Sequence, residues 1–223
     1  MKSSDYDSEI LSSWQKNAEP WTCAVRDGEI YSRVTVTDAA IIKAVMDASP
    51  KRVLDLGCGE GWLVRALADV NIDAVGMDGI PALIDNARAL GGDFRQMSFQ
   101  AFAMNGWSDE VDCAVFNFSL LGETIVADVL RVIPLILSTN GQCIIQTLHP
   151  AYVAEPYIDG WREGCWSGFS ERFSEAAPWY FRTLSSWLSL FSDSRLQLIA
   201  MHEPINPETA KPASVIFVLK VKS

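Results

Sequence analysis

Three alternating glycines preceded by an acid are the residues whose types and spacing most clearly predict chemistry. They lie in the run VLDLGCGEGW at residues 53–62, where an apolar stretch leads into Gly57, Gly59 and Gly61. Glycine allows a tight turn and leaves no Cβ between the loop and a ligand, and a helix that begins there offers free N–H groups. The pattern therefore predicts a loop that binds a carboxylate.

Two acids define which ligand this loop would suit. The dinucleotide-binding pattern is G-x-G-x-x-G without an adjacent acid, whereas here the spacing is G-x-G-x-G and Asp55 stands two residues before it. Asp55 would disfavour a pyrophosphate but could receive an ammonium group. Asp78 follows Gly57 by 21 residues, close to the roughly 20-residue spacing at which a carboxylate binds a ribose diol. A ligand with an amino-acid end and a ribose would fit both acids.

The elements that must position these residues alternate along the chain. Short apolar runs and amphipathic stretches follow one another from Arg52 onward, as expected when helices connect parallel strands. The sequence predicts strands at 52–56, 73–78, 93–97, 112–117, 142–147, 196–203 and 214–221. It predicts helices at 61–68, 81–90, 124–137 and 183–192, and Pro134 is expected to kink or end the third of these.

The last two predicted strands are joined by a segment too short for a crossover helix, so they should pair antiparallel. The fold class that follows is α/β, with a seven-stranded, mostly parallel sheet flanked by helices and an antiparallel C-terminal strand pair. Residues 1–223 are expected to form a single domain. Residues 1–50 would be an N-terminal helical lid, with Thr37 or Asp38 capping a helix over 39–46.

With this order of elements, residues 53–62 and Asp78 resemble motif I and the following acid of class I S-adenosylmethionine-dependent methyltransferases. The resemblance covers most of residues 50–147 and implies S-adenosylmethionine as the cofactor. It implies that Asp55 orders the loop near the ammonium group and that Asp78 binds the ribose hydroxyls. The remaining residues implied by it are Gly57, Cys58 and Gly59 along the methionine portion and Gly79 and Ile80 beside the adenine.

Two later strand ends depart from or extend the family's pattern. Where the family commonly has an acid for the adenine amino group, this chain has Ser98 and Phe99, whose hydroxyl and backbone N–H are candidate adenine contacts. Asn117 ends the fourth strand, where the family's chain passes beneath the sulfonium. It is a candidate for a backbone contact to the methionine portion, or alternatively a turn residue.

His149 is the candidate acid/base residue because it follows the fifth strand, and ligands of open α/β sheets lie beyond the carboxyl ends of the strands. An imidazole can accept a proton near neutral pH. The alternative is a histidine that orders the next segment by hydrogen bonding.

That next segment, residues 148–182, holds nine of the chain's 23 aromatic residues and should be an irregular insertion that covers the substrate pocket. Aromatic side chains can wall a small-molecule pocket, although they can also pack only on one another. The candidate pocket residues from the insertion and from the N-terminal lid are Tyr152, Tyr157, Trp161, Trp179, Trp14 and Trp21.

Composition narrows the partners and the compartment. The formal net charge of −10, with no run of Lys or Arg, disfavours nucleic acid and anionic membranes. Five scattered cysteines with no C-x-x-C pair predict neither a disulfide framework nor a metal site. The opening residues have no apolar signal and no stretch is long enough to span a bilayer, so a cytoplasmic location is expected.

Three functions remain compatible with these residues. The first is methyl transfer to O or N of a small molecule, which the acidic surface and the aromatic insertion favour. The second is a peptide or protein N-methyltransferase, for which Glu155, Asp159 and Glu163 could supply an acidic groove. The third is a non-catalytic S-adenosylmethionine-binding subunit of a partner enzyme. The identity of the acceptor and the oligomeric state stay open.

Overall fold

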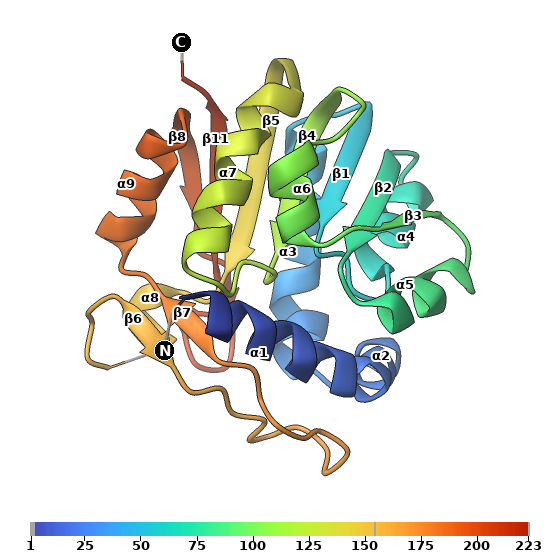
Figure 1. Cartoon of the computed structure of the whole chain (residues 1–223), viewed down its shortest axis with the longest axis vertical. Helices are drawn as coiled ribbons and strands as arrows, with labels where there is room; N and C mark the ends of the chain where they lie inside the picture. Colours follow the sequence, from blue (N-terminus) through green and yellow to red (C-terminus); the bar gives the residue numbers. More distant parts are fainter. Residues whose placement is uncertain (1–2, 154, 223) are drawn as a thin grey trace.

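The computed structural model describes residues 3–153 and 155–222, which form three layers with a central sheet between two sets of helices (Figure 1). The sheet has seven strands in the order β3-β2-β1-β4-β5-β11-β8. Their bounds are β1 Arg52–Leu56, β2 Asp73–Asp78, β3 Asp93–Gln96, β4 Val111–Asn117, β5 Leu137–Thr147, β8 Leu196–His202 and β11 Val215–Val221. The predicted α/β fold class is confirmed.

The directions of the strands also follow the prediction. The strands β3, β2, β1, β4 and β5 pair parallel, and β11 pairs antiparallel with both β5 and β8. The short hairpin β9 (Ile205–Asn206) and β10 (Lys211–Pro212) separates β8 from β11. Because β11 lies between β5 and β8, the sheet is completed only by the last segment of the chain.

Alternation along the strands produces the two cores, since successive side chains point to opposite faces. Leu54 and Leu56 of β1 pack on one face, while Val53 packs on the other. The helices α6 (Phe99–Asn105), α7 (Thr124–Ile136) and α9 (Leu184–Asp193) cover the first face. The second is covered by α3 (Asp38–Asp47), α4 (Trp62–Asp69) and α5 (Pro81–Arg88).

Some elements differ from the prediction. Helix α6 was not predicted, because it has only seven residues. Ser98 caps its N-terminus, where the hydroxyl accepts a hydrogen bond from Ala101 N at 3.1 Å. Thr37 occupies the N-cap position of α3 as predicted, but its side chain makes no capping hydrogen bond, because α3 continues directly from the π-helical turn η1 (Arg33–Thr37). Helix α7 ends two residues after Pro134, as the missing N–H and the ring clash require.

The N-terminal segment and the insertion lie together at one end of the sheet. Helices α1 (Ser3–Lys16) and α2 (Ala18–Arg26) cross the end toward which the arrow of β5 points, and β6 (Gly160–Arg162) and β7 (Trp179–Phe181) lie beside them (Figure 1). The insertion is less irregular than predicted, since β6 and β7 pair antiparallel and α8 (Pro150–Val153) opens the segment. The N-terminal helices and the insertion thus meet over the carboxyl ends of the strands.

Within the described part of the chain, none of the helices combines the length and the apolar character that crossing a membrane requires. Its five cysteines are free.

Candidate active site

The glycine loop after β1 adopts backbone angles that only glycine adopts without strain. Gly57, Gly59 and Gly61 have φ of +78°, +56° and +84°. A Cβ on Gly57 would lie 2.4 Å from the Ser119 Cβ, and one on Gly61 would lie 2.4 Å from the Phe94 ring. The loop therefore packs directly against the ends of the neighbouring strands, and its glycines serve both the turn and this close approach.

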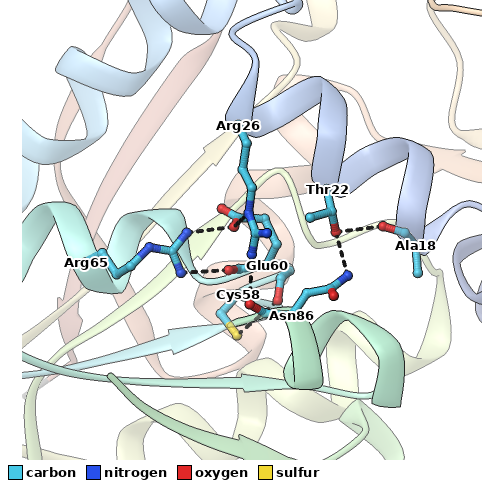
Figure 2. Close-up of polar contacts among 8 residues, drawn as sticks. Ala18, Thr22, Arg26, Cys58, Glu60, Arg65 and Asn86 are labelled. Atoms are coloured by element: carbon cyan, nitrogen blue, oxygen red, sulfur yellow. Dashed lines mark hydrogen bonds and ion pairs between the residues drawn. The ribbon is translucent and has the colours of Figure 1, made fainter. Parts of the chain in front are cut away.

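A buried carboxylate fixes the loop to the helices around it. Glu60 is 1% exposed, and its Oε2 accepts from Arg26 Nε at 3.0 Å and from an Arg65 terminal nitrogen at 2.6 Å (Figure 2). Arg26 also donates to the Asn86 carbonyl at 2.7 Å, and Asn86 donates to the Thr22 hydroxyl at 3.0 Å. This network, drawn in Figure 2, connects the loop with α2, α4 and α5.

Asp78 ends β2 and braces the same loop. One carboxylate oxygen accepts from Gly59 N at 3.0 Å and the other accepts from Ile80 N at 2.8 Å. Burial raises the pKa of Asp78, and the backbone N–H groups of Ile80, Gly59 and Gly79 oppose that rise. An acid held in this way beside the loop can accept hydroxyl hydrogen bonds from a ligand, because each carboxylate oxygen takes more than one donor.

Asp55 lies deeper, in the middle of the sheet. Its side chain is 2% exposed and its Oδ1 has no hydrogen-bond partner among the described residues. Burial raises the pKa of Asp55 to about 7, the charge of Asp78 adds to the rise, and Arg33 opposes it. The structure does not place Asp55 in the lining of the pocket, so a role at the ammonium group would be indirect.

Arg33, from the N-terminal segment, also lines the pocket. It is 8% exposed, its Nε donates to Asp38 Oδ1 at 3.0 Å, and its Nη2 has no partner among the described residues. The guanidinium carbon lies 4.6 Å from the Trp62 ring centroid and 5.9 Å from that of Trp21. The Arg33 cation is thus held beside the glycine loop, and its Nη2 can donate to a further group. Its position depends on η1, which no local pattern indicated.

A pocket of about 550 Å³ runs from the glycine loop to the insertion. Eleven of the seventeen predicted site residues line it: Gly57, Cys58, Gly59, Asp78, Gly79, Ile80, Phe99, Asn117, Trp14, Trp21 and Trp179. The structure does not bring the other six to its surface; these are Asp55, Ser98, His149, Tyr152, Tyr157 and Trp161. The predicted cofactor loop and part of the predicted acceptor wall therefore share one cavity.

The end of β4 enters this pocket with an unusual backbone. Asn117 Oδ1 is buried without a hydrogen-bond partner among the described residues, and Phe118, which follows it, has φ of +55°. Left-handed backbone at a bulky residue costs on the order of 1–3 kcal/mol and is typical of ligand sites. The Ser119 hydroxyl donates to the Leu56 carbonyl at 2.7 Å and joins this turn to β1. Phe118 and Ser119 line the pocket, although the sequence did not single them out.

His149 is buried outside the pocket, with 3% of its surface exposed. Its Nε2 lies 2.7 Å from Glu203 Oε1, and its Nδ1 accepts from Ala151 N at 3.2 Å. With Nδ1 accepting, Nε2 carries the proton and donates to the carboxylate. Neither nitrogen then has a free lone pair to take a proton from a methyl acceptor. This geometry favours the alternative in which the ring orders the start of the insertion.

The three predicted aromatic residues missing from the pocket support the insertion from outside. Tyr152 is 55% exposed, the Tyr157 hydroxyl accepts from Leu184 N at 2.8 Å, and the Trp161 ring stacks on Tyr6 with centroids 4.0 Å apart. Other aromatic residues replace them in the pocket wall. These are Trp166, Phe169, Tyr180, Phe181 and Trp187, and sequence alone offered no signal to choose among them.

The lid and the insertion are joined by a set of contacts that we call the clasp: Ser13, Asn17, Ser174 and Glu175. Asn17 is fully buried; its Nδ2 donates to the Ser174 carbonyl at 2.6 Å and its Oδ1 accepts from Ser174 N at 2.9 Å. The Ser13 hydroxyl donates to the Glu175 carbonyl at 2.5 Å. Beside the clasp, the rings of Trp14 and Trp166 meet edge to face at 5.8 Å. Trp14 and Trp166 line the pocket, so the clasp lies next to its wall.

No group of three or more His, Cys, Asp or Glu side chains in residues 3–153 and 155–222 is arranged to hold a metal ion.

The parallel sheet with its antiparallel final strand, the glycine loop after β1 and the acid after β2 are together the framework of a Rossmann-like methyltransferase. Comparison with known proteins agrees. A family model described as "Methyltransferase domain" matches residues 47–171, more than half of the chain. The chain therefore belongs to this methyltransferase family. None of the curated proteins compared with it matches its sequence.

Solved structures share the fold at low sequence identity. The 1,6-didemethyltoxoflavin-N1-methyltransferase of Burkholderia thailandensis has a TM-score of 0.71 at 15% identity, covering 100% of this chain and 92% of that one. An S-adenosylmethionine-dependent methyltransferase of Clostridium acetobutylicum gives 0.67 at 12%, with 90% and 100% covered. One from Mesorhizobium loti gives 0.62 at 20%, with 81% and 95% covered.

Proposed function

We propose that this S-adenosylmethionine-dependent methyltransferase transfers the methyl group to an oxygen or nitrogen atom of a small molecule. One observation carries the proposal: a single pocket of about 550 Å³ joins the glycine loop to an aromatic wall that includes Trp14 and Trp166 beside the clasp. Small-molecule sites are typically enclosed, mostly apolar cavities of roughly 300–1,000 Å³ with a few polar groups. The toxoflavin-type enzyme named above acts on such a molecule.

The residues present fit the cofactor. Asp78 would bind the ribose hydroxyls, Gly79 and Ile80 would border the adenine, and Arg33 with its unpartnered Nη2 would meet the carboxylate. The buried Asp55 would attract the ammonium group from behind the loop. S-adenosylmethionine supplies an electrophilic methyl carbon on a sulfonium, which favours displacement by an oxygen or nitrogen lone pair.

The protein's part in this reaction is alignment and the exclusion of water. The left-handed turn at Phe118 and the loop at Gly57 fix one side of the pocket, and the insertion fixes the other. Holding two reactants in line removes much of the entropic barrier, and a closed pocket prevents hydrolysis. A displacement that uses an existing lone pair needs little acid/base work, which is compatible with a His149 that stays outside the pocket.

The alternative of a peptide N-methyltransferase is less well supported. It would need the acids of the insertion to face the pocket, but Glu155 and Glu163 are exposed and do not line it. Asp159 accepts from Thr183 N at 2.7 Å and also lies outside the lining. A non-catalytic S-adenosylmethionine-binding subunit would need the glycine loop, but it would have no use for the aromatic acceptor half of the pocket.

Calorimetric titration with S-adenosylhomocysteine and with NAD tests the proposed cofactor site. We expect saturable binding of S-adenosylhomocysteine and none of NAD, because Asp55 disfavours a pyrophosphate. Asp78→Ala should weaken S-adenosylhomocysteine binding by about 1.5–3 kcal/mol, the range for hydrogen bonds to a charged group.

Asp73→Ala is the matched control, since Asp73 is an exposed acid at the other end of β2. It should leave the dissociation constant unchanged. Tight NAD binding, or equal effects of the two substitutions, would contradict the assignment. Acceptor turnover is then measured by S-adenosylhomocysteine release across phenols, amines and nitrogen heterocycles, and binding without any turnover would favour the non-catalytic subunit.

A further inference from the structure

Arg182 is a buried cation in the acceptor half of the pocket. It follows β7, lines the pocket and is 5% exposed. Its Nη2 donates to the carbonyls of Gly122 at 2.9 Å and of Glu123 at 2.8 Å, whereas its Nη1 is buried with no hydrogen-bond partner among the described residues. One edge of the guanidinium is therefore fixed by the backbone, and the donor of Nη1 is left for another group.

Burial is the main influence on the charge of Arg182. It lowers the pKa of Arg182 to about 10, and Tyr180, Asp159 and Glu123 oppose that shift to a smaller extent. Among the described residues, neither acid approaches it within ion-pair distance. A guanidinium with this pKa stays charged near neutral pH, and a buried charge without a partner is costly. An anion in the pocket would offset that cost.

Aromatic rings next to the guanidinium indicate the shape of that anion. The Arg182 guanidinium carbon lies 4.8 Å from the Tyr180 ring centroid and 5.1 Å from that of Trp187. Together with Trp179, Phe181 and Phe169, these rings make the pocket wall apolar on several sides. Flat rings pack well on such walls, whereas a flexible chain would lose more entropy on binding.

The two buried arginines divide the pocket between two anions. Arg33 lies beside the glycine loop with Trp62 and Trp21, and Arg182 lies in the insertion with Tyr180 and Trp187. Each carries one terminal nitrogen without a partner among the described residues. If Arg33 meets the cofactor carboxylate, Arg182 is left for the acceptor.

We propose that the methyl acceptor is a planar conjugated ring bearing an anionic oxygen, such as a carboxylate or an ionised enol, and that Arg182 anchors this oxygen. The proposal rests on the proposed function, because the acceptor must share the pocket with the cofactor. Arg182 is then a residue that determines specificity, and the fixed Nη2 edge orients Nη1 so that the ring is held at one angle. Guanidinium groups suit this role, since their planar donors keep their geometry.

The test measures binding to the protein saturated with S-adenosylhomocysteine. The probes are pairs of equal shape and different charge: benzoate with benzamide, 2-naphthoate with 2-naphthamide, and quinoline-2-carboxylate with its amide. We expect at least one carboxylate to bind about 10- to 100-fold more tightly than its amide, the range for a hydrogen bond to a charged group. Arg182→Gln should abolish this preference while changing amide binding less than about twofold.

Arg52→Gln is the matched control, because Arg52 pairs with Asp109 at the amino end of β1, far from the insertion in the fold; it should keep the full preference. If Arg182→Gln fails to fold, Arg182→Lys retains the charge and should keep part of the preference. The proposal is wrong if no carboxylate in the panel is preferred over its amide, or if Arg182→Gln retains the preference. If the unmodified protein does not bind S-adenosylhomocysteine at all, the proposed function is wrong instead. The two failures are therefore distinguishable.

Discussion

At the scale of single residues, the fold buries acids that the sequence presented as ordinary motif positions. Asp55 is held at the centre of the sheet with an unpartnered oxygen and a pKa of about 7. Desolvation is the main cause, because burial disfavours the charged form. The ionised form of Asp55 therefore destabilises the folded state, and the stability of the protein depends on pH.

Asp55→Asn should flatten the pH dependence of stability. The pKa of Asp55 is raised from 3.8 to about 7 on folding, so the folded state binds more protons between these values and stability falls as pH rises through this window. A shift of this size corresponds to up to about 4 kcal/mol. Urea unfolding at pH 5, 6, 7 and 8 measures it.

The free energy of unfolding of the variant, relative to that of the unmodified protein, should therefore rise from pH 5 to pH 7 and level off by pH 8. Asp112 and Asp159, whose pKa values are lowered, affect stability only at more acidic pH. Parallel pH curves for the two proteins would show that Asp55 is not a buried, protonatable acid.

His149→Gln separates architecture from catalysis. Because both ring nitrogens are engaged by Glu203 and Ala151, we expect a lower melting temperature with kcat near normal once an acceptor is known. A general base would instead lose roughly 10²- to 10⁴-fold in kcat at unchanged stability. His202→Gln, at the exposed end of β8, is the control. Steady-state kinetics and thermal unfolding of both variants decide between the two roles.

At the scale of elements, the pocket is closed by two segments that are far apart in the sequence. Asn17 and Ser174 are separated by 157 positions, yet their amide and backbone groups exchange hydrogen bonds. Other polar contacts between the N-terminal segment and the loop between Gly164 and Pro178 lie nearer the surface: Ser13 and Lys16 bind Glu175, and Arg172 binds Glu29. We therefore expect the clasp to control how often the pocket opens.

Asn17→Ala should open the clasp. It leaves the Ser174 N–H and carbonyl without their partner and should cost about 1–3 kcal/mol locally. Limited proteolysis should then cut the insertion several-fold faster, and S-adenosylhomocysteine should bind more weakly. Asn105→Ala, at the exposed end of α6, serves as the control. Equal cleavage rates for the two variants would mean that Asn17 does not control the opening of the insertion.

At the scale of the whole molecule, the sheet depends on the final strand. Phe217 of β11 is fully buried, 5.1 Å from the Phe191 ring centroid and 6.1 Å from that of Trp187. Because β11 hydrogen-bonds to both β5 and β8, its loss would separate the strand that leads into the insertion from the edge of the sheet.

Phe217→Ala should therefore destabilise the whole fold by about 3–5 kcal/mol, the usual cost of such a cavity. Urea unfolding followed by circular dichroism and by tryptophan fluorescence should give coincident transitions at a lower midpoint. Lys220→Ala, an exposed position on the same strand, should change little. Separate transitions would mean that the C-terminal strands unfold independently of the site.

Much of this architecture could be predicted from sequence because it depends on neighbouring residues. Short apolar runs predicted the bounds of β1 and β2 as the structure has them, and the glycine spacing located the loop and Asp78. The seven-residue α6 was missed, since a helix of two turns carries little periodicity.

The lining of the pocket was decided by tertiary structure. His149 and Asp55 were predicted as site residues from their chemical type and their places near strand ends, but such a place does not fix the direction of a side chain. His149 binds Glu203 and Asp55 is buried in the sheet, so neither side chain lines the pocket. Arg33 and Arg182 line the pocket because of a π-helical turn and a hairpin, neither of which was predicted from the local sequence. Sequence thus determined the fold class and the cofactor loop, where the interactions are local. The folded chain decided which side chains line the pocket, because that depends on contacts between segments distant in sequence, such as those of Arg182 with Gly122 and of Asn17 with Ser174.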